Sequence, residues 1–250
     1  MKNLFLAIFI GLLGLSNLVF ALGTSVGVIE IPVNPDIVYK SSFRAYTDAE
    51  AISIQLQNWN IDYQGNSVSD IKEPFSGTWI TIPKTAKKAK KGDNFIDAPY
   101  TILIPAEPKK EYMVKLLVGE TDISKPNQMS ISVGIGIPVY VWPMGLPAAK
   151  VSVSDVSYNK GALNAAISNP GPLHVRPSVD VEVFKAVGVW PFQGKESVYS
   201  GEFTRYWPVL ANAKRLYIKQ VSLEKGHYNA VFKSSDGIDG QTEFEFDVVQ

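Results

Sequence analysis

The chain has 250 residues and no cysteine, and its 24 lysines and arginines balance 24 aspartates and glutamates. A formal net charge of zero does not favour binding to nucleic acid or to a charged membrane surface. The lack of cysteine excludes disulfides, thiol catalysis and cysteine-based metal sites, so the chain must fold by packing alone.

The N-terminus has the pattern of an export signal. A lysine precedes an apolar run over residues 4–20, and small residues follow that run. The pattern predicts a secretory signal peptide over residues 1–21, cut after Ala21, with a cut after Gly23 as second choice. The run is also about as long as a short membrane span, so an uncleaved anchor is the alternative.

The first half of the remaining chain predicts strands. Short alternating runs are separated by Gly, Pro, Asn and Asp, which is typical of an all-β sandwich. Ile52, Ile54 and Leu56 alternate with polar residues, as in a strand with one solvated face. Residues 63–66 predict a turn. The strands expected before residue 120 cover residues 26–33, 37–39, 42–46, 51–59, 78–82, 100–104 and 112–118.

The next predicted strand, residues 130–142, is the most informative segment. Every odd position from 131 to 141 is Ile or Val, whereas the even positions are Ser, Ser, Gly, Gly, Pro and Tyr. A period of two over this length predicts a strand with one fully apolar face. Pro138 cannot donate a ladder hydrogen bond, which favours a sheet edge. A long apolar edge is an aggregation hazard unless it pairs with another protein's strand.

Two prolines and a glycine within residues 142–147 predict a stiff connector. We therefore expect an N-terminal domain over residues 24–142, a linker over 143–149 and a C-terminal domain over 150–250. About seven strands in roughly a hundred residues match an immunoglobulin-like sandwich. The strands expected in this second domain cover residues 151–157, 162–168, 174–184, 197–200, 215–221, 228–232 and 242–249.

A lysine-rich run occupies residues 84–92, between two predicted strands. Blocks of like charge usually form solvated loops, and a loop is expected here. The functional alternative is a docking site for an acidic partner surface.

Short motifs recur along the chain in the segments Asn34–Tyr39, Ser53–Trp59 with Asp62 and Gly65–Asn66, Ile102–Glu107, Tyr112–Leu116, Ile135–Val141 and Asn169–Arg176. In this order, they resemble the PapD-like periplasmic pilus chaperones, and the similarity covers nearly all of the chain after the signal. The last strand of the first domain is similar to that of the non-classical, archaic branch of this family.

The resemblance implies two immunoglobulin-like domains around a cleft, and a chaperone that lends an edge strand to pilin-like subunits lacking their own last strand. It also implies delivery of the subunits to an outer-membrane usher, with no cofactor and no small-molecule substrate. The donor side chains would be Ile131, Val133, Ile135, Ile137 and Val139.

One departure from the family concerns its carboxylate anchor. Members of the classical branch hold the C-terminal carboxylate of a subunit with two basic residues in the cleft. The matching positions here are Asp36 or Ile37 and Pro138, and none of them is basic. Lys115 and Arg44 are candidates for a relocated anchor, and the alternative for both is a solvated surface cation.

No other constellation predicts chemistry. His174 and His227 are the only histidines and lie far apart in sequence, so we expect no metal site, and His174 is expected to bond backbone locally. No nucleophile elbow is present, and no catalytic residue is assigned. The tryptophans are expected in cores and between domains. The rival hypothesis is a secreted structural or adhesion protein of tandem immunoglobulin-like domains.

Overall fold

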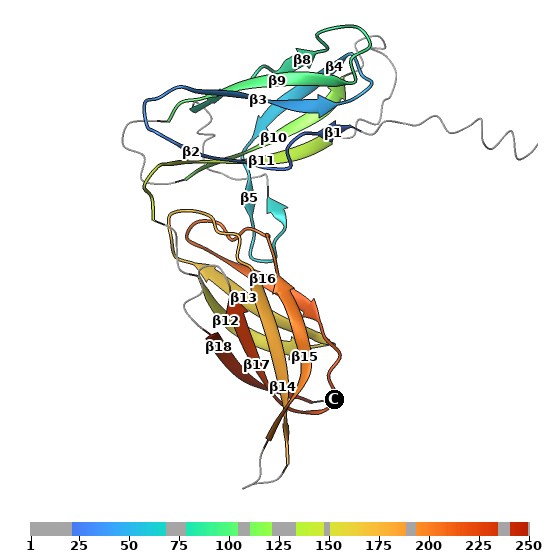
Figure 1. Cartoon of the computed structure of the whole chain (residues 1–250), viewed down its shortest axis with the longest axis vertical. Helices are drawn as coiled ribbons and strands as arrows, with labels where there is room; N and C mark the ends of the chain where they lie inside the picture. The colour runs from blue at the N-terminus through green and yellow to red at the C-terminus, as the bar shows by residue number, and fades with distance from the viewer. Residues whose placement is uncertain are drawn as a thin grey trace, which may run out of the picture.

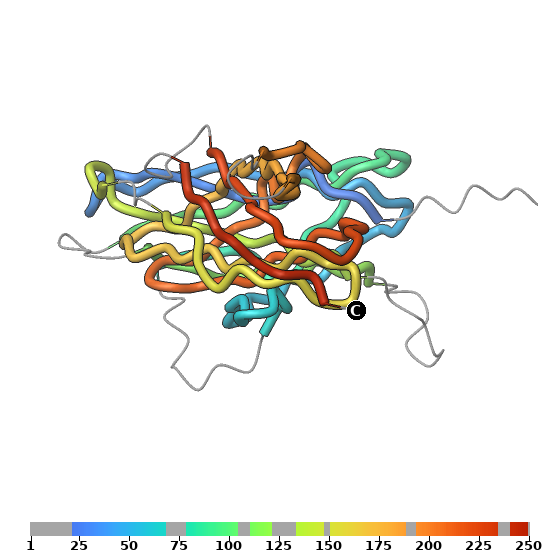
Figure 2. Tube along the Cα trace, turned by 90° about the horizontal axis from the view of Figure 1, so that it is seen from below, coloured from blue at the N-terminus to red at the C-terminus, as the bar shows by residue number. Residues whose placement is uncertain are grey.

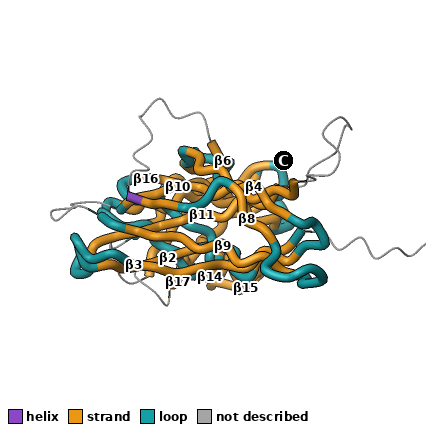
Figure 3. The backbone as a smooth tube through the Cα atoms, turned by 90° about the horizontal axis from the view of Figure 1, so that it is seen from above, coloured by secondary structure: helices purple, strands orange, loops and turns teal. Residues whose placement is uncertain are grey.

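A computed structural model describes residues 22–68, 79–104, 111–121, 134–147, 151–188, 194–234 and 241–249. Strands and loops make up nearly all of this part of the chain, and its only helical residue is a short 3₁₀ turn at Trp79 (Figure 3). The predicted class, an all-β protein of two sandwiches, is confirmed (Figure 1). Among the residues that the structure describes, no helix has the length and apolar character needed to cross a membrane. The predicted signal peptide, residues 1–21, lies outside the described residues.

The first sandwich packs two sheets around one apolar core. Alternation explains its strands: in β10, Val114, Leu116 and Val118 are all buried, whereas their neighbours are half-exposed. One sheet has the order β1-β3-β9-β7 and the other β2-β11-β10-β4-β8. The strands are β1 (Gly23–Thr24), β2 (Ile29–Val33), β3 (Tyr39–Tyr46), β4 (Ala51–Gln57), β7 (Ile80–Thr81), β8 (Thr85–Lys87), β9 (Phe95–Ile102), β10 (Tyr112–Thr121) and β11 (Gly134–Pro143).

The second sandwich has its own core, built on residues such as Leu163, Val181 and Phe232. Its sheets have the orders β12-β13-β16 and β15-β14-β17-β18. The strands are β12 (Ser152–Asn159), β13 (Ala162–Asn169), β14 (Val179–Val187), β15 (Gly194–Thr204), β16 (Ala213–Gln220), β17 (Gly226–Ser234) and β18 (Gln241–Val248).

A small hairpin of β5 (Asn60–Ile61) and β6 (Ser67–Val68) leaves the first sandwich and reaches the second (Figure 1). In Figure 2 it stands clear of the sandwich strands as a cyan loop. The turn predicted at residues 63–66 is its tip, closed by hydrogen bonds from the backbone N–H groups of Asn66 and Gly65 to Asp62. The carbonyl of Tyr63 accepts a 2.7 Å bond from the N–H of Leu216 in β16. The hairpin therefore joins the two domains.

The lysine-rich run differs from the expected loop. Residues Thr85–Lys87 form β8, which pairs antiparallel with β4 and buries Ala86 in the core. A single small apolar residue between polar neighbours is too weak a pattern for a strand to be predicted from it. The pairing with β4 decides the conformation.

The structure corrects the expected orientation of the apolar row of β11. Ile137 and Val139 are fully buried in the first domain's own core, and Ile135 is half-buried against the same core. A period of two shows that one strand face is apolar but does not say what covers it, and here the facing sheet covers Ile137, Val139 and Val141. Ile131 and Val133 lie outside the described residues.

Candidate functional site

The edge of β11 is covered by another strand over only half of its length. The parallel strand β2 pairs with Val139–Pro143, and no described strand pairs with the same edge over Gly134–Pro138. The cause is a change of sheet in the N-terminal segment: β1 pairs with β3 in the other sheet, and the chain crosses over before β2 begins. The predicted sheet edge therefore exists for Gly134–Pro138, which we call the open edge.

The outer face of the open edge is not bare. An added Cβ at Gly136 would lie 3.1 Å from Cδ of Lys115, and one at Gly134 would lie 3.1 Å from Cδ1 of Leu117. Both long side chains come from β10. Leu117 is the direct cross-strand partner of Gly136, and Lys115 is that of Pro138. The glycines therefore leave room for the side chains of Lys115 and Leu117 from the same sheet.

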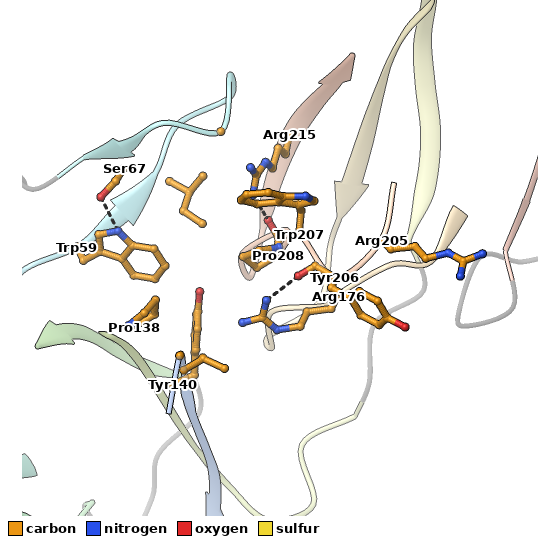
Figure 4. A pocket seen from close by; sticks show the side chains of 14 residues that line it. Trp59, Ser67, Pro138, Tyr140, Arg176, Arg205, Tyr206, Trp207, Pro208 and Arg215 are labelled. Carbon is orange, nitrogen blue, oxygen red and sulfur yellow. Dashed lines mark hydrogen bonds between the residues drawn. The ribbon is translucent and has the colours of Figure 1, made fainter. Parts of the chain in front are cut away.

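A pocket of about 580 Å³ lies where the two domains meet, close to the inner end of the open edge. The first domain contributes Pro138 and Tyr140 from β11, and the second contributes a loop with two exposed aromatic rings, Tyr206 and Trp207 (Figure 4). The full lining is Gly27, Val28, Trp59, Ile61, Gly65, Ser67, Pro138, Tyr140, Arg176, Arg205, Tyr206, Trp207, Pro208 and Arg215. The pocket is therefore aromatic, with cationic groups supplied by the second domain.

Two buried donors of this pocket have no partner within the described chain. They are the hydroxyl of Tyr140 and the Nε of Arg215. Burial raises the pKa of Tyr140, so the hydroxyl keeps its proton at neutral pH. Arg215 donates from Nη1 to the carbonyl of Pro208 at 2.8 Å and lies over the ring of Trp207 at 5.4 Å. An acceptor group entering the pocket could satisfy both donors.

The other two arginines of the lining have partners. Arg176 donates to Glu30 and to the carbonyl of Tyr206, both at 2.6 Å. Arg205 points away from the pocket in Figure 4 and pairs with acidic residues of its own domain, Asp180 at 3.4 Å and Glu202 at 3.1 Å. Arg215 is thus the lining arginine with no described carboxylate beside it.

A charged cluster next to the pocket also joins the domains. His174 lies between two glutamates of the first domain, with Nδ1 2.5 Å from Glu111 and Nε2 3.1 Å from Glu30. The pKa of Glu30 is lowered to about 2 by its hydrogen bond with His174 and, to a smaller extent, by its hydrogen bond with Arg176, although burial opposes this. Burial disfavours the charged form of His174, but the two carboxylates outweigh it and raise its pKa.

This cluster corrects the expectation that the side chain of His174 bonds backbone locally. Both ring nitrogens contact carboxylates from the other domain, and the backbone N–H of His174 also donates to Glu111, at 3.0 Å. These partners are 63 and 144 residues away in sequence, so no local pattern could show them. The prediction of tryptophans between domains is confirmed for Trp59 and Trp142, which pack at the junction.

The two candidate anchors lie in different places. Lys115 pairs across the sheet with Pro138, and its Nζ is 3.4 Å from Oγ of Ser67, so it lies beside the pocket. Arg44 lies on β3 in the other sheet, where its Nε is 3.1 Å from Asp97 and its guanidinium covers the ring of Phe95. The structure does not bring the two cations together.

Comparison with known proteins found no matching family model and no matching curated protein. Solved structures do match over most of their length. The class 5 fimbriae chaperone CfaA shares 12% identity over 92% of this chain and 100% of its own, with a TM-score of 0.48. The CsuC–CsuE complex of a chaperone and a tip adhesion subunit, from the archaic chaperone-usher Csu pili of Acinetobacter baumannii, shares 18% identity over 90% and 97%, also with a TM-score of 0.48.

The E. coli chaperone DraB shares 15% identity over 92% of this chain and 96% of its own, with a TM-score of 0.43.

Proposed function

We propose that the chain is a periplasmic chaperone that holds pilin-like subunits by adding its open edge to their incomplete sheets. The observation that carries the proposal is the uncharged stretch Gly134–Pro138, which no described strand pairs on the side that β2 leaves open. A partner strand can bond the free backbone groups of such an edge, and this main-chain pairing gives affinity with little dependence on sequence. One chaperone could therefore serve several subunits.

The two ends of this strand have different proposed roles. Ile137 and Val139 fix the inner end in the chaperone's own core. Ile131 and Val133 continue the apolar row outward in sequence and are the side chains proposed to fill pockets of the subunit, with Ile135 between the two groups. Each side chain buried in the subunit contributes about 1.5–3 kcal/mol before ordering costs. That range allows later exchange for another strand.

The rest of the function follows from this role. Export by the signal over residues 1–21 places the chaperone in the periplasm, and an outer-membrane usher is the proposed receiver of the subunits. The action is strand addition, so the proposal assigns no catalysed reaction, cofactor or small-molecule substrate. Lys115, beside the pocket, is the proposed anchor for the terminal carboxylate of a subunit, because a cation in a partly dry cleft forms a strong charge-assisted bond.

The test replaces the outer apolar residues and leaves the core intact. Ile131→Asp with Val133→Asp is expected to abolish co-purification of a co-expressed pilin-like subunit while the chaperone keeps its thermal unfolding midpoint. Ser130→Asp with Ser132→Asp is the matched control, because it adds the same charge at alternating positions that belong to the other face. Loss of the subunit in both variants, or in neither, contradicts strand donation by this row.

A structural or adhesion protein of tandem sandwiches is the second candidate. The burial of Ile137 and Val139 favours it, because a strand that only completes its own sheet needs no partner. This candidate predicts that the native chain retains no subunit and that its genomic neighbours encode neither an usher nor short pilins.

The anchor has its own test. Lys115→Gln is expected to weaken binding of a subunit with a free terminal carboxylate and to leave binding of the same subunit with extra C-terminal residues unchanged. Lys40→Gln, on the exposed face of β3, is the control.

A further inference from the structure

The sheet edges of this molecule differ in how they are protected against pairing. Natural edges are blunted by shortness, by proline, by charged residues or by bulges. Two edges of the first domain, β1 and β7, have only two residues each, and β2 carries Glu30 and Pro32.

The edges of the second domain are protected as well. The pairing of β12 and that of β15 are interrupted by register shifts. Acidic residues alternate along β18, at Glu243, Glu245 and Asp247. The edge strand β16 carries Lys214, Arg215 and Lys219, and the hairpin tip from the first domain bonds it at Leu216. Each of these edges therefore has at least one protective feature.

The strand β8 combines three protective features at the far edge of the sheet that holds β11. It has three residues, Pro83 lies two residues before it, and exposed lysines stand at 84 and 87. The carbonyl of Lys84 accepts from Ile54, and the N–H of Lys88 donates to Glu50, so the backbone groups of these two residues face the sheet. Alternation then turns the backbone of Thr85 and Lys87 outward, where an incoming strand would pair.

The open edge lacks charge altogether. Gly134, Ile135, Gly136 and Ile137 offer neither a charged side chain nor a register shift, and Pro138 stands only at the inner end, where β2 begins. The two edges belong to one sheet, in the order β2-β11-β10-β4-β8. An open edge and an unprotected β8 edge on opposite sides of one sheet would let copies join head to tail. Such a contact does not close and produces open chains.

We infer that Pro83, Lys84 and Lys87 form an edge guard that makes strand addition one-sided. The guard prevents β8 of one copy from pairing with the open edge of another, and it prevents capture of a second subunit at β8. The inference rests on the proposed function only in taking Gly134–Pro138 as an edge that accepts strands. Lys84 and Lys87 then protect a sheet edge and do not dock an acidic partner.

Local contacts separate the guard from the rest of the lysine-rich run. Lys88 donates from Nζ to the carbonyl of Asp48 at 2.9 Å, and the backbone N–H of Lys90 donates to Asp93 at 2.9 Å, which closes the following turn. Lys90 and Lys91 are exposed in this turn, outside β8. They provide a control that removes the same charge from the same run without touching the edge.

The experiment compares the self-association of full-length mature protein in the absence of any subunit. The edge variant carries Lys84→Thr with Lys87→Thr, and the control carries Lys90→Thr with Lys91→Thr. A third variant adds Gly134→Lys to the edge variant. Sedimentation velocity over a wide range of concentrations measures the mass, and circular dichroism checks that each variant is folded. The single change Lys87→Thr replaces the double change if the latter does not fold.

We expect the edge variant to show a weight-average mass that rises at least about twofold with concentration, as an open chain requires. The control and the variant with Gly134→Lys are expected to keep the mass of the native protein at every concentration. An edge variant that stays monomeric overturns the inference, and so does equal association of edge variant and control. An edge variant that is monomeric but no longer co-purifies a pilin-like subunit also overturns it and indicates docking by these lysines instead. Because the self-association measurement contains no subunit, its failure leaves the proposed chaperone role to be tested separately.

Discussion

The rings of Tyr140 and His174 stack across the domain junction, with centroids 4.0 Å apart and an interplanar angle of 22°. Tyr140 is fully buried in β11, and His174 belongs to the segment that precedes β14. Arg176 approaches the same tyrosine ring at 5.8 Å. Since His174 also contacts Glu30 and Glu111, one histidine links the packing and the charges of the junction.

We therefore expect the protein to lose stability as pH rises above neutrality. Contacts with Glu111 and Glu30 outweigh burial and raise the pKa of His174 above 6.5. A group with a higher pKa in the folded state contributes stability that is fully present below its unfolded pKa, and this stability is lost as pH rises through the folded pKa. Urea unfolding midpoints are expected to decline as pH rises from about 6.5 through the raised folded-state pKa of His174.

The second histidine supplies the control for this pH dependence. His227 pairs with Asp247 at 2.9 Å, but its side chain is 52% exposed. His174→Gln is expected to flatten the decline, and His227→Gln to preserve it. An unchanged slope in His174→Gln would contradict the role of the junction.

The hairpin tip gives a second prediction. Gly65 has φ +88, and an added Cβ there would lie 2.5–2.9 Å from the guanidinium of Arg215. Gly65→Ala is expected to destabilise the protein by the strain of a left-handed residue, about 1 kcal/mol, and further by displacing Arg215. Gly92→Ala is the matched control, because Gly92 has φ +96 and nothing within 4 Å of the added Cβ. Equal losses of unfolding free energy would mean that Arg215 moves aside without cost.

Period-two alternation was enough to predict most strands, because a half-buried strand leaves that pattern wherever it pairs. Thus β4, β10 and β13 lie within a few residues of their predicted bounds. The same pattern could not show which layer covers Ile137 and Val139, since their own core and a partner's groove need the same residues. That distinction depends on the facing sheet.

Contacts between distant segments were also beyond prediction. The open edge exists because β2 reaches only Val139–Pro143, and this register involves residues about a hundred positions apart. The pocket combines Tyr140 with Arg215, which are 75 positions apart, and Arg215 lies in none of the motifs. The unpredicted strand β8 likewise depends on its pairing with β4.

The corrected orientation of β11 makes a third prediction. Ile137→Ala is expected to reduce the free energy of unfolding by about 2–5 kcal/mol, because it opens a cavity in a closed core. Ile135→Ala is expected to cost roughly 1 kcal/mol, because that side chain is only half-buried. Chemical unfolding of the isolated chaperone measures both. Similar small losses would show that Ile137 is free to face a partner after all.

Asn169, at the start of the motif that contains His174, gives the fourth prediction. Its side chain is buried, its amide nitrogen donates to the carbonyls of Leu173, Val209 and Leu210 at 2.7–3.1 Å, and its amide oxygen accepts from Gly171 at 3.0 Å. Asn169→Asp replaces the donor with an acceptor that faces three carbonyls, so a loss of about 3 kcal/mol or more is expected.

The matched control for this change is Asn164→Asp. The amide of Asn164 is half-buried and makes only long bonds, at 3.3 and 3.5 Å, so a loss below about 1 kcal/mol is expected there. Mild acid is expected to restore part of the stability of Asn169→Asp, because a protonated carboxyl can donate one hydrogen bond. Urea unfolding at neutral and acidic pH measures both effects. Tolerance of Asn169→Asp at neutral pH would show that the segment around His174 is held by other contacts.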